Sequence, residues 1–190
     1  MRIGILALQG DFEAHAAAIR RACSGCKVSE VRLARDLEAL DGLVIPGGES
    51  TTMLKLMEYY SLFDPLKEFG RHKPVFGTCA GSILMAAEVL NPPQRSLELL
   101  DMAVERNAYG RQLDSRVTRI DGHELGGGPL EAVFIRAPII RRVGEGGRVL
   151  ASYNGDPVLV EFGHHLTATF HPELSEDNRV HRLFVEKVRR

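Results

Sequence analysis

One cysteine stands between two apolar runs, in the segment Gly77-Thr78-Cys79-Ala80-Gly81. Glycines two residues to either side of Cys79 give a crowded backbone turn the room that it needs. This is the pattern of a nucleophile elbow, a strand-to-helix turn, with cysteine in the place of serine. The thiol would lie at a helix N-terminus, whose partial positive charge stabilises a thiolate. The alternative is a small buried cysteine packed beside a tight turn.

A histidine and a carboxylate follow the last apolar run, in Phe170-His171-Pro172-Glu173-Leu174. Pro172 favours an extended backbone at His171, and side chains two residues apart in an extended chain point the same way. Glu173 can therefore orient the imidazole. Taken alone, such a pair is more often a surface contact. Together with Cys79 it completes a nucleophile, a base and an orienting group.

A glycine-rich segment follows a third apolar run, in Pro46-Gly47-Gly48-Glu49-Ser50-Thr51. The two glycines free the backbone to point N–H groups into a cavity. Such groups suit an oxyanion hole, which we expect Gly48 to share with the backbone N–H of Ala80. The alternative is an ordinary Pro-Gly turn.

Other patterns do not complete a site. Cys23 and Cys26 form a C-x-x-C pair, but no second pair of ligands completes a zinc site, so we expect no metal. We expect this pair to end the first helix, with redox chemistry as the less favoured alternative. Leu8-Gln9-Gly10-Asp11 lacks the G-x-G-x-x-G spacing and no Walker loop occurs, which disfavours nucleotide binding.

The elements that must position these residues alternate between strand and helix in the first half of the chain. Apolar runs predict strands at Ile3–Leu8, Val28–Leu33, Leu43–Ile45 and Pro74–Phe76. Helical spacing predicts helices after a cap at Asp11, over Thr52–Tyr60 and through Ile83–Ala87. This alternation predicts an α/β fold, a parallel sheet with helices on both faces.

The second half of the chain has a different texture. Short β-like runs, separated by turn residues, predict hairpins that extend the same sheet or form a small mixed one. A closing helix is predicted from about Asp177, with Val180, Leu183, Phe184 and Val188 facing inward. The β-like runs are Val104, Val117–Ile120, Val133–Ile135, Val149–Ala151, Val158–Val160 and Leu166–Phe170.

The composition excludes several classes of protein. The chain has 190 residues, with 24 Lys plus Arg against 25 Asp plus Glu, so it offers no strong field for nucleic acid or anionic lipid. No apolar run approaches the roughly 18 residues of a membrane helix, and Gln9-Gly10-Asp11 interrupts the first apolar run too early for a signal peptide. Three cysteines, an odd number, suit a reducing cytosol better than a disulfide framework. We therefore expect one cytoplasmic domain over residues 1–190.

Taken together, these motifs resemble the class I, triad-type glutamine amidotransferases. More closely, the chain resembles the glutaminase subunits of pyridoxal 5′-phosphate synthase. The resemblance adds three segments to the motifs above: Leu8-Gln9-Gly10, Val104-Glu105-Arg106-Asn107-Ala108-Tyr109-Gly110-Arg111-Gln112 and Phe134-Ile135-Arg136-Ala137-Pro138. It implies a flavodoxin-like, mixed but mostly parallel sheet with helices on both faces, and no cofactor.

The resemblance also implies a mechanism. Cys79 attacks the side-chain amide carbon of L-glutamine, His171 moves the protons, Glu173 holds the imidazole, and water releases L-glutamate from a thioester. The oxyanion lies against N–H groups near Gly48 and Ala80. The residues that the resemblance assigns to the glutamine site are Gly47, Gly48, Glu49, Arg106, Ile135 and Arg136. Without the resemblance, the two arginines would be read as solvated ion pairs.

A partner follows from the chemistry of ammonia, which at neutral pH becomes ammonium, a poor nucleophile. A glutaminase must therefore pass it directly to an acceptor. The resemblance implies a separate (β/α)₈-barrel synthase subunit that docks over the active-site face. Gln9 and the Gly47-Gly48 loop are candidates for sensing it, and we expect low activity without it.

Three other functions stay open. The chain could serve another synthase, such as one in histidine or anthranilate formation, although the segment from Arg106 to Gln112 argues against this. It could be an intracellular cysteine peptidase, which needs an open cleft. It could also be a binding protein, in which Cys79→Ala would leave every activity intact.

Overall fold

The computed structural model describes residues 1–106 and 115–190. Its centre is a seven-stranded sheet in the order β10-β11-β12-β4-β3-β1-β2. Strands β2, β1, β3, β4 and β12 run parallel, and β11 and β10 continue the sheet as antiparallel strands. In sheet order, the strands are Gly147–Tyr153, Asp156–Phe162, His165–Ala168, Val75–Thr78, Gly42–Ile45, Arg2–Leu6 and Lys27–Val31.

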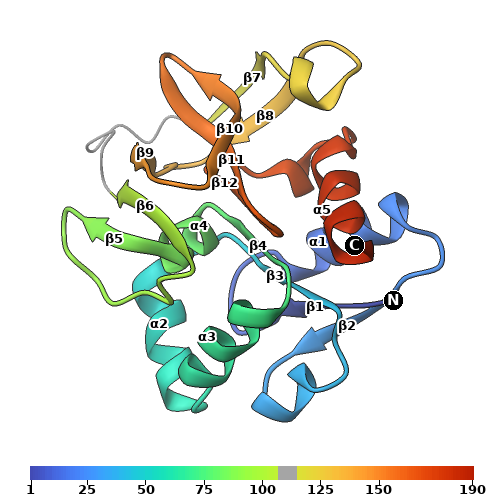
Figure 1. Cartoon of the computed structure of the whole chain (residues 1–190), viewed down its shortest axis with the longest axis vertical. Helices are drawn as coiled ribbons and strands as arrows, with labels where there is room; N and C mark the ends of the chain where they lie inside the picture. Colours follow the sequence, from blue (N-terminus) through green and yellow to red (C-terminus); the bar gives the residue numbers. More distant parts are fainter. Residues whose placement is uncertain (107–114) are drawn as a thin grey trace.

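Both faces of this sheet are covered, which explains why its central strands are continuous apolar runs. On β1, Ile3 and Ile5 join the core beneath α1 and α5, whereas Leu6 joins the core beneath α2, α3 and α4. Figure 1 shows α1 and α5 side by side, with α2 and α3 at the opposite side of the strands. The helices are α1 Phe12–Ala22, α2 Ser50–Tyr59, α3 Phe63–His72, α4 Ala80–Met85 and α5 Arg179–Arg189.

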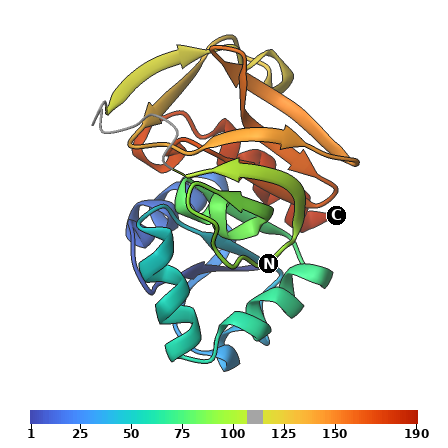
Figure 2. The ribbon, with the colours of Figure 1, turned by 90° about the vertical axis from the view of Figure 1, so that its left-hand side faces the viewer.

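Smaller sheets and short 3₁₀ turns complete the fold. A three-stranded sheet has the order β5-β6-β9, and β7 and β8 form an antiparallel pair. Figure 2 shows β7 to β11 gathered at the end of the molecule opposite α2 and α3. The remaining elements are β5 Ala86–Leu90, β6 Leu100–Glu105, β7 Arg116–Ile120, β8 Leu130–Phe134, β9 Ile139–Val143, η1 Ala34–Leu37, η2 His123–Leu125 and η3 Pro172–Leu174.

The predicted fold class is confirmed, and several elements differ from the prediction. The helix after Cys79 ends at Met85 rather than Ala87, because Ala86 adopts an extended backbone and begins β5, which pairs with β6. Helix α3 and strands β5 and β9 were not predicted. In the described ranges, no helix has the length and apolar character needed to cross a membrane.

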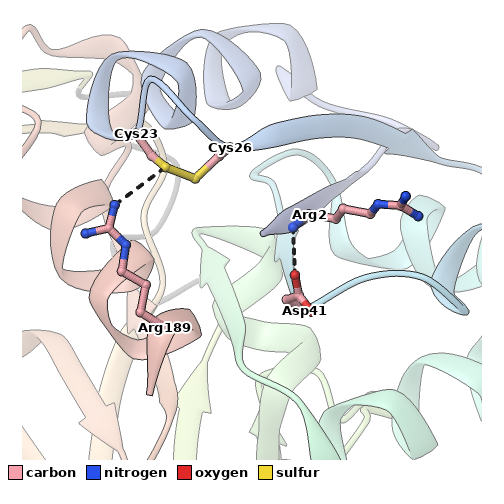
Figure 3. The surroundings of a disulfide bond; sticks show 5 residues. All are labelled: Arg2, Cys23, Cys26, Asp41 and Arg189. Carbon is pink, nitrogen blue, oxygen red and sulfur yellow. Dashed lines mark hydrogen bonds between the residues drawn. A yellow bond between two sulfur atoms is a disulfide. The ribbon is translucent and has the colours of Figure 1, made fainter.

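One disulfide was not predicted, although the expected position of its cysteines at the end of the first helix is confirmed. Cys23 does cap the C-terminus of α1, as expected, but it is joined to Cys26 in a disulfide, and Cys79 is the free cysteine. Figure 3 shows the guanidinium of Arg189 directed at this disulfide, with its Nη2 3.8 Å from the sulfur of Cys23. The fold brings α5 to this point, and the odd number of cysteines carries no information about such local pairing.

Candidate active site

The sheet topology gathers the predicted site residues at one edge. Cys79 directly follows β4, His171 follows β12, and Gly47 follows β3. Strands β12 and β3 lie on either side of β4 and run parallel to it. The carboxyl ends of parallel strands meet at one edge of a sheet, where α/β folds bind their ligands. Residues far apart in sequence therefore meet above β4.

Cys79 occupies a strained turn. Its φ of 49° and ψ of −104° lie outside the regions that side-chain-bearing residues prefer. Its N–H donates to the carbonyl of Ala168, at 2.9 Å, which fixes the turn to β12. A Cβ on Gly81 would lie 2.1 Å from the carbonyl oxygen of Ile45, and one on Gly77 would lie 2.7 Å from the backbone of Gly81. The two flanking glycines are therefore required for close backbone approach, as the elbow pattern predicts.

His171 and Glu173 meet, although not through an extended chain. His171 Nδ1 lies 2.7 Å from Glu173 Oε1, and both side chains are buried. Pro172–Leu174 forms a 3₁₀ turn, so the expected extended geometry is wrong at this point. The N–H of His171 donates to the carbonyl of Val133 in β8, at 2.8 Å, and the 3₁₀ turn that follows brings Glu173 back to the imidazole.

The electrostatics favour a charged pair at Cys79. Burial disfavours a charged imidazole, but hydrogen bonds to Cys79 and Glu173 outweigh it and raise the pKa of His171 to about 10. Burial likewise opposes ionisation of Glu173, yet the imidazoles of His15 and His171 beside it hold the pKa of its carboxyl below the usual range. A protonated imidazole beside the thiol stabilises a thiolate, which is the nucleophilic form of cysteine.

Cys79 and His171 open into one pocket with a volume of about 270 Å³. Seven of the predicted site residues line it: Gly48, Glu49, Cys79, Arg106, Ile135, Arg136 and His171. Gln9, Ser50 and Ile83 complete the lining. Ile83 was not predicted, although it lies four residues after Cys79 and so one helical turn along the same side of α4.

Three predicted residues lie behind the pocket wall. Glu173 is buried on the far side of His171. Gly47 packs on the imidazole, since a Cβ there would lie 2.4 Å from His171 Cε1. Ala80 is buried at the first position of α4, where backbone N–H groups have no partner within the helix.

Glu49 lines the pocket and also contacts the start of α2 and the side chain of Arg106. Its carboxylate caps α2, accepting from the N–H groups of Thr51 and Thr52 at 3.0 and 2.7 Å. Arg106 Nη2 lies 3.4 Å from Glu49 Oε1 and donates to Thr51 Oγ1 at 2.7 Å. Burial opposes ionisation, but these hydrogen bonds from Thr52 and Thr51 lower the pKa of Glu49 to about 2. Glu49 is thus a fixed negative charge at the rim of the pocket. Of the predicted segment from Val104 to Gln112, residues 107–112 lie outside the described residues.

The opposite wall comes from the chain after β8. The thiol of Cys79 lies 3.9 Å from the carbonyl oxygen of Ile135. Arg136 has a φ of 46° and lines the pocket, and within the described part of the chain it has no ion-pair partner. A guanidinium free of a carboxylate can grip the carboxylate of a ligand with two hydrogen bonds. In residues 1–106 and 115–190, no three His, Cys, Asp or Glu side chains gather as a metal site.

Comparison with known proteins identifies the family. The SNO glutamine amidotransferase family matches residues 5–190. The chain belongs to this family. A pyridoxal 5′-phosphate synthase subunit PdxT of Solibacter usitatus is 58% identical, over 98% of this chain and 99% of the relative. The subunit of the same name in Koribacter versatilis is 51% identical, over 100% of this chain and 96% of the relative.

One solved structure agrees with this family assignment, and a second shares the fold. A crystal structure of a glutamine amidotransferase has a TM-score of 0.90 and 44% identity, covering 99% of each chain. A glutamine amidotransferase of Thermotoga maritima, with 16% identity and a TM-score of 0.62 over 98% of this chain and 81% of the other, shares the fold. The range of the present chain that matches the family, residues 5–190, contains the elbow cysteine, the histidine–glutamate pair and the residues that line the pocket.

Proposed function

We propose that this glutamine amidotransferase is the glutaminase subunit of a pyridoxal 5′-phosphate synthase, one domain over residues 1–190. It would hydrolyse L-glutamine to L-glutamate and ammonia. The observation that carries the proposal is the placement of Cys79, His171 and Glu173 at adjoining strand ends, with the thiol and the imidazole open to one small pocket. The PdxT relatives, matched over nearly the whole chain, support the choice of synthase.

The proposed reaction begins from the charged pair, in which the Cys79 proton already lies on His171 and the sulfur is a thiolate. The thiolate attacks the side-chain amide carbon of glutamine, and the carbonyl oxygen takes the negative charge against the N–H groups of Gly48 and Ala80. When the tetrahedral intermediate collapses, His171 protonates the leaving nitrogen, the C–N bond breaks and ammonia departs. A glutamyl thioester remains on Cys79. His171 then activates a water molecule, which replaces the sulfur and releases glutamate.

Glutamine would lie between the charged walls of the pocket. Arg136 is suited to the substrate carboxylate because its guanidinium is not paired within the described residues. Glu49 is suited to the substrate ammonium, with Arg106 balancing its charge. Gly48 and Ile135 contribute backbone at the reacting end, and Gly47 supports the imidazole.

The partner is proposed to be a (β/α)₈-barrel synthase subunit seated over the carboxyl edge of the sheet. The loop after β1 is tied to the candidate oxyanion loop, since Glu49 N–H donates to Gln9 Oε1 at 3.1 Å. A partner that contacts Gln9 would therefore change the position of the Gly48 backbone. We place the complex in the cytoplasm, as expected from the sequence.

The shape of the pocket weighs against a peptidase. A volume of about 270 Å³ is below the usual range for drug-sized ligands and suits a single amino acid better than an extended peptide. A glutaminase serving a different synthase is the remaining rival, and recovery of the native partner by pull-down decides between the two.

The test combines the chain with glutamine and a (β/α)₈-barrel synthase, and traps the intermediate for mass spectrometry. We expect a glutamyl adduct on the peptide that contains Cys79, and none in Cys79→Ala. Cys26→Ser is the matched control, because Cys26 lies outside the pocket, and it should keep the adduct. An adduct on another cysteine, or turnover of peptide amides in preference to glutamine, contradicts the proposal.

A further inference from the structure

A buried histidine that the proposed mechanism does not use lies behind Glu173. His15, in α1, is fully buried. Its Nε2 lies 3.0 Å from Thr78 Oγ1 and 3.3 Å from Glu173 Oε2. Its Nδ1 lies 3.2 Å from Nε2 of His181 in α5. No motif in the sequence singles out His15, which lies on the buried face of an amphipathic helix.

The second oxygen of Glu173 needs a donor. Oε1 faces His171, whereas Oε2 is buried and makes no hydrogen bond within the described part of the chain. Leaving a buried carboxylate oxygen without a nearby donor is costly. The nitrogen nearest to Oε2 is Nε2 of His15, at 3.3 Å, and the same nitrogen forms a hydrogen bond with Thr78 Oγ1 at 3.0 Å.

The neighbours of His15 determine which nitrogen carries its proton. A lone pair on Nε2 would face the negative Oε2 of Glu173, 3.3 Å away, which favours a proton on Nε2, and Thr78 Oγ1 at 3.0 Å is able to accept from that N–H. Nδ1 is then an acceptor and receives the Nε2–H of His181. This arrangement leaves Nδ1 of His181 as a bare acceptor, in agreement with its having no partner among the described residues. The reverse arrangement would bury an unpaired N–H and repel Glu173.

His15 acts as a neutral group in this arrangement. Burial lowers the pKa of His15, against the opposing attraction of Glu173. Asp11, on the same helix, also favours the charged form, whereas the nearby imidazole of His171 disfavours it. Burial lowers the pKa of His181 as well, with His15 and Arg21 adding to the effect. The N–H dipole, rather than a full charge, therefore faces Glu173.

We propose that His15 is a positioning residue, which donates from Nε2 to Glu173 Oε2 and so keeps Oε1 aimed at Nδ1 of His171. The hydrogen bond that His15 Nε2 makes in the structure is with Thr78 Oγ1, at 3.0 Å, so the proposed N–H is shared between Glu173 and the residue before the nucleophile. The inference rests on the proposed function and extends it from three residues to a buried chain that runs from α5 to Cys79.

Two substitutions distinguish the roles of the two ring nitrogens of His15. His15→Gln places an amide N–H near the position of Nε2, and His15→Asn places one near the position of Nδ1. In the complete complex, we expect His15→Asn to lower kcat by about 10- to 100-fold, as for loss of a hydrogen bond to a charged group, with KM little changed. His15→Gln should stay within about threefold of wild type, because the donor toward Glu173 is kept. Equal losses in the two variants contradict the proposal.

A second readout does not depend on glutamine. The rate of Cys79 alkylation by iodoacetamide reports the thiolate as a function of pH. A misplaced Glu173 stabilises the imidazolium less, so the His15→Asn profile should move to higher pH and the His15→Gln profile should match wild type. A merely structural defect would lower both folding stability and activity without moving this profile. An unmoved profile in a folded His15→Asn variant contradicts the proposal.

A third measurement uses the wild-type full chain and no variant. Nitrogen NMR of ¹⁵N-histidine-labelled protein distinguishes the two tautomers of a neutral imidazole. We expect His15 to be neutral and protonated at Nε2, and a proton on Nδ1 or a charged ring at pH 7 overturns the proposal. If wild type fails to hydrolyse glutamine beside its synthase, the proposed function fails, while the alkylation and NMR results still decide on His15.

Discussion

Gly47 is the residue that gives the catalytic imidazole its place in the proposed site. The backbone of Gly47 lies where a Cβ would come within 2.4 Å of His171 Cε1 and 3.3 Å of the Cβ of Cys79. The side chains that must exchange a proton are thus confined by a main-chain wall. A wall of backbone is stiffer than one of side chains, and precise placement of reacting groups is a large part of catalysis.

Gly47→Ala tests this wall. The added methyl should displace His171 and lower glutaminase kcat/KM by about 100-fold, the loss expected from a misplacement of about 1 Å. Gly25→Ala is the matched control, since a Cβ there meets nothing within 4 Å, and it should keep wild-type activity. Steady-state kinetics of the two variants in the complex provide the comparison. A fully active Gly47→Ala enzyme would show that the imidazole is not confined as described.

The charge on His171 links the site to stability. Its pKa is about 10 in the folded chain against 6.5 as the ordinary value, so between these two values the folded state binds more protons than the unfolded state. The stabilisation is therefore complete below pH 6.5 and is lost as the pH rises through about 10. Urea unfolding of wild type and His171→Asn should show the wild-type advantage shrinking over this window. An advantage that is constant from pH 6 to pH 10 would contradict the charged pair.

At the scale of elements, α1 connects three features of the molecule. Asp11 caps its N-terminus by accepting from the N–H of Ala14, at 3.0 Å. His15 on its buried face reaches Glu173, and Cys23 at its C-terminus closes the disulfide with Cys26. The helix thus links the start of β2 to the support of the proposed triad. A helix fixed at both ends can hold a side chain such as His15 more rigidly than a loop.

Counting thiols tests the C-terminal end of α1. In denaturant without a reductant, the chain should have one reactive thiol, that of Cys79, and after reduction it should have three. Closing so short a loop stabilises the fold by about 2 kcal/mol in the chain-entropy account, so reduction should lower the midpoint of urea unfolding. A Cys23→Ser, Cys26→Ser variant, which cannot form the bond, should match the reduced protein. Three reactive thiols before reduction would contradict the disulfide.

At the scale of the whole molecule, buried neutral histidines limit stability in acid. His165 Nδ1 accepts from the N–H of Val75 at 3.2 Å, which requires that nitrogen to be unprotonated. Burial, with the neighbouring His164 adding to it, lowers the pKa of His165 to about 4. Burial also lowers the pKa of His15 and of His181. These groups therefore bind protons more readily in the unfolded chain.

The free energy of unfolding should fall as the pH drops below 6.5 and continue to fall toward about 4. The sign follows because the unfolded state binds the extra protons over this range. Urea titrations at several pH values measure the dependence, and His165→Gln should reduce its slope. A free energy of unfolding that is the same at pH 6.5 and pH 4.5 would contradict the neutral state of these side chains.

The partner subunit is the second whole-molecule prediction. Because Gln9 holds the candidate oxyanion loop from outside the sheet, docking over that face should change the position of Gly48. We expect glutamine hydrolysis to be slow in the isolated chain and faster by about tenfold or more beside the synthase, in proportion to an improved oxyanion hole. Gln9→Ala should remove most of the gain that the synthase provides. Equal rates with and without the synthase would contradict the coupling.

The sequence by itself determined the α/β class, the elbow at Cys79, the pairing of His171 with Glu173 and the glycine loop at Gly47. Each of these features depends on a short, continuous segment of the sequence. A strand covered on both faces must be apolar throughout, and a tight elbow needs glycine where backbone approaches backbone, so local pattern is sufficient.

Only the tertiary structure decided the end of α4 at Met85, the disulfide at Cys23, the place of Ile83 in the pocket and the contact between His15 and Glu173. The residues after Met85 could continue the helix or form a strand, and their local propensity does not decide between the two. Pairing with β6 makes them a strand. The amphipathic pattern of α1 likewise does not show which buried side chain faces the triad. These outcomes depend on the order of the strands in the sheet, which brings distant segments together. The periodicity of a single segment does not show which other segment will lie beside it.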